Sequence, residues 1–199
     1  MSLALGRHAR RARTRLFNFR SDKDGATAVE FGLICFPFFA IIFGIMGVCQ
    51  IFFWIFTMEN AVWSASRDMR TGAFQTNAVG SRYAGLAGDP LKTEFKKAIC
   101  EKAVNYNDCF NHSSVLVQSN TTFAGIAAPN CKDGMNNLVS DTAAMAAFSA
   151  GAASSVVLIT LCHGWSFGAK LSFLPMSNTL ADGSLLIQAS AAFRTEPYN

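Results

Sequence analysis

The chain has 199 residues, of which 51% are hydrophobic and 15% charged, and its formal net charge is +4. Residues 1–24 carry seven of the 17 basic residues and two of the 13 acidic residues, so the rest of the chain is close to neutral. Membrane topology and anionic lipid explain a basic surplus confined to the N-terminus. Because no stripe of basic and aromatic residues follows residue 25, nucleic-acid binding is excluded as an expected function.

A long apolar run follows this basic segment. Residues 31–56 contain no charged side chain, and at about 1.5 Å per residue such a helix spans a hydrocarbon core of about 30 Å. The run is too long for a cleaved signal peptide, and the basic residues before it predict a cytoplasmic N-terminus. We therefore expect a basic leader over residues 1–25, a transmembrane and stalk helix over 26–72, and an exported domain over 73–199.

One acidic residue, Glu30, stands at the start of the apolar run, where a carboxylate is costly unless it has a function. Gly25 precedes it by five positions, and Phe31 follows it. This spacing resembles the processing site of type IV-pilin-like proteins. In that family a prepilin peptidase cuts after the glycine, which would leave a free amine on Ala26, and the carboxylate neutralises the amine of a neighbouring subunit. The alternative is that Glu30 only extends to the lipid headgroups.

The helix continues beyond the apolar run. Pro37 predicts a kink, and after residue 56 the pattern becomes amphipathic. The apolar positions are Met58, Val62, Ala65 and Met69. The positions expected to face elsewhere are Glu59, Ser66, Arg67, Asp68 and Arg70. Gly72 is a typical left-handed stop, so we expect the helix to end near Thr71.

A second helix is indicated by Asp89 as its N-cap, followed by Pro90 at the first helical position. One face of this helix is apolar and the other carries lysines, and we expect it to pack on a sheet. The apolar positions are Leu91, Phe95, Ile99 and Ala103. The lysines are Lys92, Lys96 and Lys102.

Three strands are predicted, over residues 114–120, 155–162 and 185–194. The last alternates apolar and polar side chains, and the second is uniformly apolar, which favours the central position. Residues 143–154 favour a short helix followed by a loop, and residues 164–183 a long loop or hairpin. The predicted fold class is α+β: a long N-terminal membrane-spanning helix continuing into a small exported domain, in which a second helix packs on an antiparallel sheet of about three strands.

Six cysteines divide between these parts. Cys35 and Cys49 lie in the apolar helix, and the other four are Cys100, Cys109, Cys131 and Cys162. An even number in an oxidising compartment predicts two disulfides. Of three possible connectivities we favour Cys100 with Cys109 and Cys131 with Cys162, because the first pair closes a short loop. A zinc site is the alternative, but the cysteines lack close-pair spacing; we expect no metal and no cofactor.

The sequence offers little for catalysis. Cys162 and His163 are neighbours on a predicted strand, where they point to opposite faces, and His112 beside Ser113 has the same weakness. No phosphate-binding loop or nucleophile elbow occurs. We therefore expect no enzyme and no small-molecule substrate. Two alternatives remain: an uncleaved single-span protein whose periplasmic domain binds a ligand or surface, and an anchored hydrolase that depends on His112 and His163.

With these residues in hand, the chain resembles the TadE-like family, the pseudopilins of the tight-adherence (Flp) pilus machinery. The resemblance covers residues 25–72 and a C-terminal block, 189–198. It implies a minor pilin-like protein of the bacterial inner membrane, cut by prepilin peptidase after Gly25, with its domain in the periplasm or carried into a pilus at the cell surface. Its partners would be other pilins or pseudopilins, and its role pilus initiation, assembly or adhesion. The TadE and TadF subtypes stay open, because Cys162 and His163 stand where the family has an aromatic residue.

Overall fold

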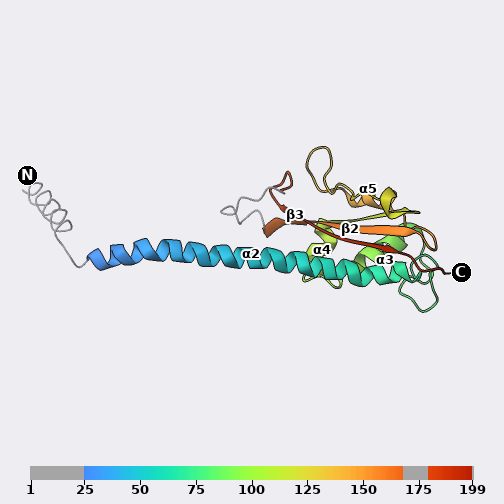
Figure 1. The fold of residues 1–199 in the computed structure, drawn as a ribbon, viewed down its shortest axis with the longest axis horizontal. Coiled ribbons are helices and arrows are strands. Elements are labelled where there is room, and N and C mark those ends of the chain that lie inside the picture. Colours follow the sequence, from blue (N-terminus) through green and yellow to red (C-terminus); the bar gives the residue numbers. More distant parts are fainter. Residues whose placement is uncertain (1–24, 168–178, 199) are drawn as a thin grey trace, which may run out of the picture. The chain divides into compact units, whose positions relative to one another are not determined.

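The first described element is a single long helix. A computed structural model describes residues 25–167 and 179–198. Helix α2 (Ala26–Arg70) is its first helix (Figure 1). The helix remains α-helical through Pro37, and the kink expected there stays a prediction. The helix ends one residue before the expected position. Gly72 then has a φ of 81°, and a Cβ at this position would lie 2.5 Å from the Tyr198 ring, so only glycine fits this stop.

The chain divides into two compact units, Met1–Gly47 and Val48–Asn199. The described part of the first unit is Gly25 and the N-terminal portion of α2. The second unit contains the rest of α2 and all the other described helices and strands. The basic leader expected over residues 1–25 lies, except for Gly25, outside the described residues.

The second unit is built on a three-stranded antiparallel sheet. Its strands are β1 (Ser113–Asn120), β2 (Val156–Trp165) and β3 (Leu185–Arg194), in the order β1-β2-β3. All ten residues of β2 are buried, which confirms the central position predicted from its uniformly apolar sequence. The exposed residues of β3 alternate with buried ones from Ile187 onward, as its period of two predicts.

Strand β2 extends three residues beyond its expected end, because Gly164 does not start a loop. The β2–β3 ladder continues through the pairs Gly164 with Leu186 and Trp165 with Leu185. A Cβ on Gly164 would lie 3.1 Å from the Leu180 Cδ1 atom and 3.3 Å from the Ser184 Oγ atom. The glycine therefore allows the following turn to fold closely over the strand.

Three helices accompany the sheet: α3 (Gly88–Cys100), α4 (Tyr106–His112) and α5 (Asp141–Ala146), with a short 3-10 turn, η2 (Phe123–Gly125). The expectation that Asp89 caps α3 is wrong: the N-cap is Ala87, and Asp89 lies in the first turn, where its negative charge still favours the helix dipole. Helix α5 is the predicted short helix. Helix α4 was not predicted.

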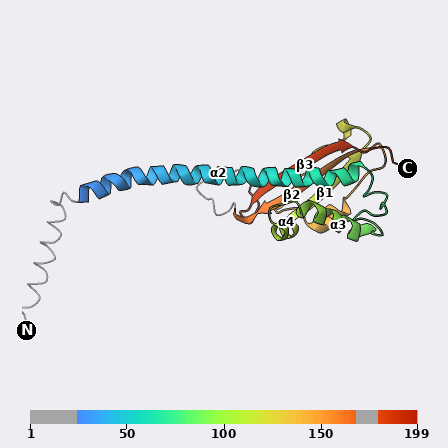
Figure 2. The same ribbon diagram turned by 90° about the horizontal axis from the view of Figure 1, so that it is seen from below.

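The main core lies on one face of the sheet, between the strands and helices α2 and α3. The apolar positions predicted for the second half of α2 are all buried there, and so are Phe95 and Ile99 of α3, which confirms that a second helix packs on the sheet. A smaller cluster on the opposite face joins Leu116 and Cys162 to Ala144 of α5. Figure 2 shows α2 running along the sheet, with α3 and α4 on one side of it.

Two polar residues that were expected to lie away from the apolar faces of their helices are buried. Ser66 is buried and donates a hydrogen bond to the Trp63 carbonyl. Lys96 of α3 is also buried, and its Nζ atom lies 2.5 Å from Asp141 at the start of α5 and 4.9 Å from the Phe110 ring centroid. A long amphipathic side chain can enter a core when its charge finds a partner. This ion pair therefore connects α3 to α5.

The Lys96–Asp141 pair predicts unequal costs for its two neutral variants. Asp141→Asn leaves a buried ammonium without its counter-charge and should lower the free energy of unfolding by about 2 kcal/mol. Lys96→Met keeps the packing and leaves Asp141, whose side chain is 45% exposed, to be hydrated, so the loss should be about 1 kcal/mol. Urea titration of the full chain in detergent micelles measures both. Equal losses, or a larger loss for Lys96→Met, would contradict this assignment.

Candidate processing and assembly segment

The predicted processing site lies where helix α2 begins. Gly25 is exposed, with no atom within 4 Å of the position that a Cβ would occupy, and Ala26 is the first residue of α2. The Gly25–Ala26 peptide bond is therefore at the boundary of the helix, and no described residue that is distant in sequence crowds the Cβ position of Gly25. A bond in this position is open to a protease, and cutting it would leave α2 with a terminal amine.

Glu30 is the fifth residue of α2, one turn beyond Ala26. Residues four apart lie on the same face of an α-helix, about 6 Å apart along its axis. Glu30 is exposed and forms no ion pair with any described residue. Its neighbour Phe31 is 70% exposed. The structure thus presents a carboxylate and a large aromatic side chain together on the surface of the first helical turns.

The surface around these two residues is apolar. Helix α2 is long and apolar enough to cross a membrane, with a mean hydropathy of 2.4 in its most apolar window, of which 6% is buried. Many of its large side chains are more than half exposed, among them Phe36, Phe38, Phe43, Phe52 and Phe56. Such a surface is far larger than isolated exposed apolar residues produce. It is suited to lipid and to neighbouring apolar helices.

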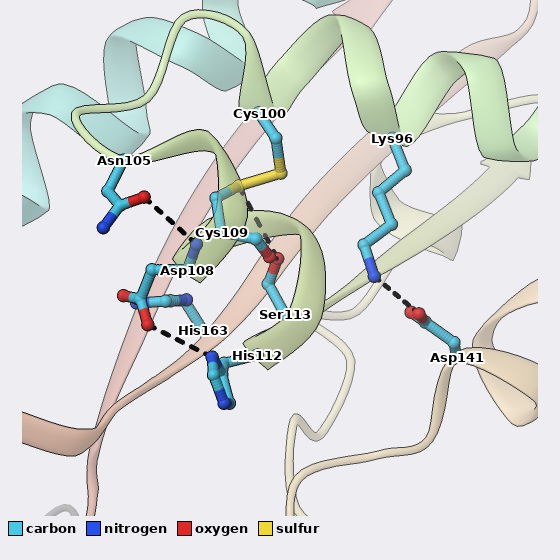
Figure 3. Close-up of a disulfide and its surroundings, with 9 residues drawn as sticks. All are labelled: Lys96, Cys100, Asn105, Asp108, Cys109, His112, Ser113, Asp141 and His163. Atoms are coloured by element: carbon cyan, nitrogen blue, oxygen red, sulfur yellow. Dashed lines mark hydrogen bonds and ion pairs between the residues drawn. A yellow bond between two sulfur atoms is a disulfide. The ribbon is translucent and has the colours of Figure 1, made fainter.

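Aromatic rings and one carboxylate attach the middle of α2 to the sheet. The Trp54 ring stacks on His163 of β2, with centroids 5.7 Å apart, and lies 5.8 Å from the Trp165 ring. Asp108 of α4 then lies between two histidines: its carboxylate oxygens are 3.3 Å from Nε2 of His163 and 3.1 Å from Nδ1 of His112 (Figure 3). This cluster joins α2, α4 and β2.

Cys162 and His163 point to opposite faces of β2, as expected. Cys162 is bonded to Cys131, whereas His163 is fully buried against Trp54. Burial lowers the pKa of His163, and the nearby Asp108 carboxylate opposes this effect. A histidine without solvent access has no role as a base toward a substrate. Among the described residues, no three His, Cys, Asp or Glu side chains gather as a metal site would require.

The structure joins Cys100 to Cys109 and Cys131 to Cys162, the two pairs favoured from loop length. The first connects the end of α3 to α4 (Figure 3). The second attaches the segment before α5 to the central strand. Each closed loop should stabilise the fold by roughly 3 kcal/mol. Cys35 and Cys49 of α2 are free.

Two features of this region were missed from the sequence. Asn105 caps α4 by accepting a hydrogen bond from the Asp108 backbone N–H, a local signal that Asn and Asp three residues apart could have given. Tyr83 donates a hydrogen bond to Asp68 of α2 at 2.8 Å, and burial raises the pKa of Tyr83. Asp68 was expected only to face away from the apolar stripe, and nothing local indicates a partner 15 residues away.

Helix α2 is apolar and exposed, begins beside Gly25, carries one carboxylate in its second turn and continues into an α+β domain. These features define a protein with a candidate membrane anchor. Residues 25–67 match the model of the family described as TadE-like protein. The match confirms the resemblance seen in the sequence and supports a protein associated with the Tad pilus. It begins at Gly25 and ends before the C-terminal block. No curated protein and no solved structure matches the chain.

The buried His163 predicts a pH-dependent stability. Because the folded protein binds a proton on His163 less tightly than the unfolded chain does, the free energy of unfolding should fall as the pH drops below about 6.5. His163→Phe keeps a ring on Trp54 and removes the titrating group, so its stability should change less between pH 7.5 and 5. Urea titrations at both pH values measure this. An identical pH dependence in the variant would refute the assignment.

Proposed function

We propose that this chain is a minor pilin-like subunit, a pseudopilin, of a Tad pilus assembly machinery. In this proposal prepilin peptidase cuts after Gly25, the mature chain begins at Ala26, and α2 holds the subunit in the membrane and among neighbouring pilins. The subunit acts in the initiation or assembly of the pilus or in adhesion. The protein is a structural component, and its chemistry is limited to being a substrate of the peptidase.

The observation that carries this proposal is the coincidence of three positions. The family match begins at Gly25, helix α2 begins at Ala26, and the sole acidic residue before Glu59 in the helix is Glu30. A cut at Gly25 would remove the seven basic residues of the leader and leave a helix whose first seven turns carry no charged side chain except Glu30. The retained carboxylate would then be one turn from the new amine.

Physical chemistry explains why such a carboxylate would be kept. An unpaired charge in lipid is costly, whereas a paired and hydrogen-bonded charge is tolerated. The first turn of a helix also has unsatisfied N–H groups and a positive dipole end. A terminal amine on a neighbouring helix adds a full positive charge. Pairing of Glu30 with that amine would set the axial position of one subunit against the next.

The rest of the proposal concerns place and partners. The basic leader favours a cytoplasmic N-terminus, which puts residues 73–199 in the periplasm of a bacterial cell and, after assembly, at the surface. The two disulfides fit an oxidising compartment. The partners are prepilin peptidase, which meets Gly25 and Ala26, and other pilins or pseudopilins, which meet Glu30, Phe31 and the exposed apolar face of α2.

Processing can be tested with two exposed glycines, Gly25 just before α2 and Gly32 within it. Gly25 and Gly32 are both exposed, with no atom near the site of a Cβ. Gly25→Val should abolish cleavage, because the side chain would occupy the position that the peptidase must accommodate, and the chain should keep its mass from Met1. Gly32→Val should be cleaved as the natural protein is. Intact mass and N-terminal sequencing of membrane-extracted protein measure both.

Two results would contradict the proposal. The first is a natural protein that still begins at Met1 in cells with an active peptidase. The second is a Gly25→Val variant with the same mature N-terminus as the control. Either result would favour the alternative, an uncleaved single-span protein with a ligand- or surface-binding domain.

A further inference from the structure

Strand β3 forms one margin of the sheet. In Figure 2 its C-terminal end lies on the other side of α2 from α3 and α4, and β2 is its sole neighbour among the described strands. At its N-terminal end Leu185 also bridges to Thr179. From residue 188 to 194, no described residue outside β2 forms a backbone hydrogen bond with the strand. Half of the N–H and C=O groups in this stretch therefore point outward without a backbone partner.

This margin lacks the usual protection against an added strand. Natural edges carry lysines, prolines, bulges or a covering segment. Residues 188–193 contain no charge and no proline, and the β2–β3 register continues through them without a bulge. The exposed side chains are small or neutral: Gln188, Ser190 and Ala192. An extended peptide would meet little resistance here.

A groove of about 500 Å³ lies beside the C-terminal end of β3, where Phe193 and residues of α2 line it. Its walls include Trp63, the largely buried Phe193, and the polar Asn60 and Ser64. Trp63 is 53% exposed. Tryptophan is enriched among the residues that anchor protein partners, and this exposed ring would be buried on binding.

The groove is also basic. Arg67 and Arg70 line it, and Arg194 ends β3. The Arg67 side chain forms no ion pair with a described residue, and Arg70 contacts Glu196 at 3.4 Å, with both side chains more than half exposed. An exposed pair of this kind is weak and can be exchanged for a better one. The groove therefore presents two guanidinium groups that are available to an incoming carboxylate.

We propose that residues 188–194 of β3 and the adjacent groove bind an extended acidic segment of a partner protein, which adds to the sheet as a fourth strand. Backbone hydrogen bonds to β3 supply part of the affinity, and carboxylates of the segment pair with Arg67 and Arg70. A second copy of this chain is the less suitable occupant, because residues 188–194, which would form the added strand, contain no acidic residue to pair with Arg67 and Arg70. The inference depends on the proposed function only in taking the partner to be a pilus subunit.

The test uses the full chain in detergent micelles and two labelled synthetic peptides. Both have ten residues of alternating threonine and valine, with two threonines replaced by glutamate in one peptide and by lysine in the other. Fluorescence anisotropy should show that the glutamate peptide binds at least about fivefold more tightly, with a preference that falls as salt rises. Hydrogen exchange should slow at amides within residues 188–194.

Charge reversal supplies the matched variants. Arg67→Glu should remove or reverse the preference for the glutamate peptide. Lys102→Glu makes the same charge change at an exposed residue outside the groove and should preserve the preference. Equal binding of the two peptides, no binding of either, an unchanged preference in Arg67→Glu, or unchanged exchange in β3 would each overturn the proposal. The assay needs neither cleavage nor a pilus, so a negative result would not contradict the proposed processing. Likewise, finding an uncleaved chain in cells would not contradict peptide binding at the groove.

Discussion

The structure depends on one helix that must suit two different surroundings. The second half of α2 buries one stripe against the sheet, beginning at Met58 and ending at Met69, and leaves polar residues between. The earlier part is apolar on all sides and exposed. The change begins around Ile51 and Trp54, which are partly buried against the core. A helix with one apolar stripe can bury that stripe against a sheet, whereas a helix that is apolar on all sides is stable in lipid or among other helices. The sequence of α2 contains both patterns in succession.

Glu30 is the exception within the apolar part, and the proposed function follows from treating it as a charge that needs a partner. Two partners are geometrically open to it after a cut at Gly25: the amine of its own chain, since Ala26 lies one turn away on the same face, and the amine of a neighbour. Pairing within one chain would neutralise both charges without connecting subunits. Pairing between chains would make assembly depend on cleavage, because the precursor has no amine at Ala26. In the proposed function, this dependence is the physical reason for processing.

Features that repeat at a fixed period were predictable from the sequence. The apolar stripe of α2, the alternation of β3 and the uniform burial of β2 all follow from local side-chain patterns. Features that depend on a distant partner were not. The charge of Lys96 indicated an exposed side chain, because the sequence does not show that Asp141, 45 residues away, lies beside it. The sequence likewise does not show that Asp108 lies against His163. Gly164 resembled the start of a loop because a single sequence does not show which turn packs over a strand. Gly25 and Glu30 of the candidate site could be proposed from the sequence alone, because the proposal rests on their spacing along the chain.

The pairing of Glu30 can be measured directly with a lipid-soluble carbodiimide, which joins a carboxylate to an amine in contact with it. Membranes from cells that produce the chain in two isotopic forms would be treated, digested and analysed by mass spectrometry, with Glu30→Gln as the control. The account predicts an amide between the Glu30 side chain and the terminal amine of another chain, seen as mixed-isotope products with a second copy or as a link to another pilin, and absent in the control. Links confined to the Ala26 amine of the same chain, or no link at Glu30 in assembled protein, would contradict it.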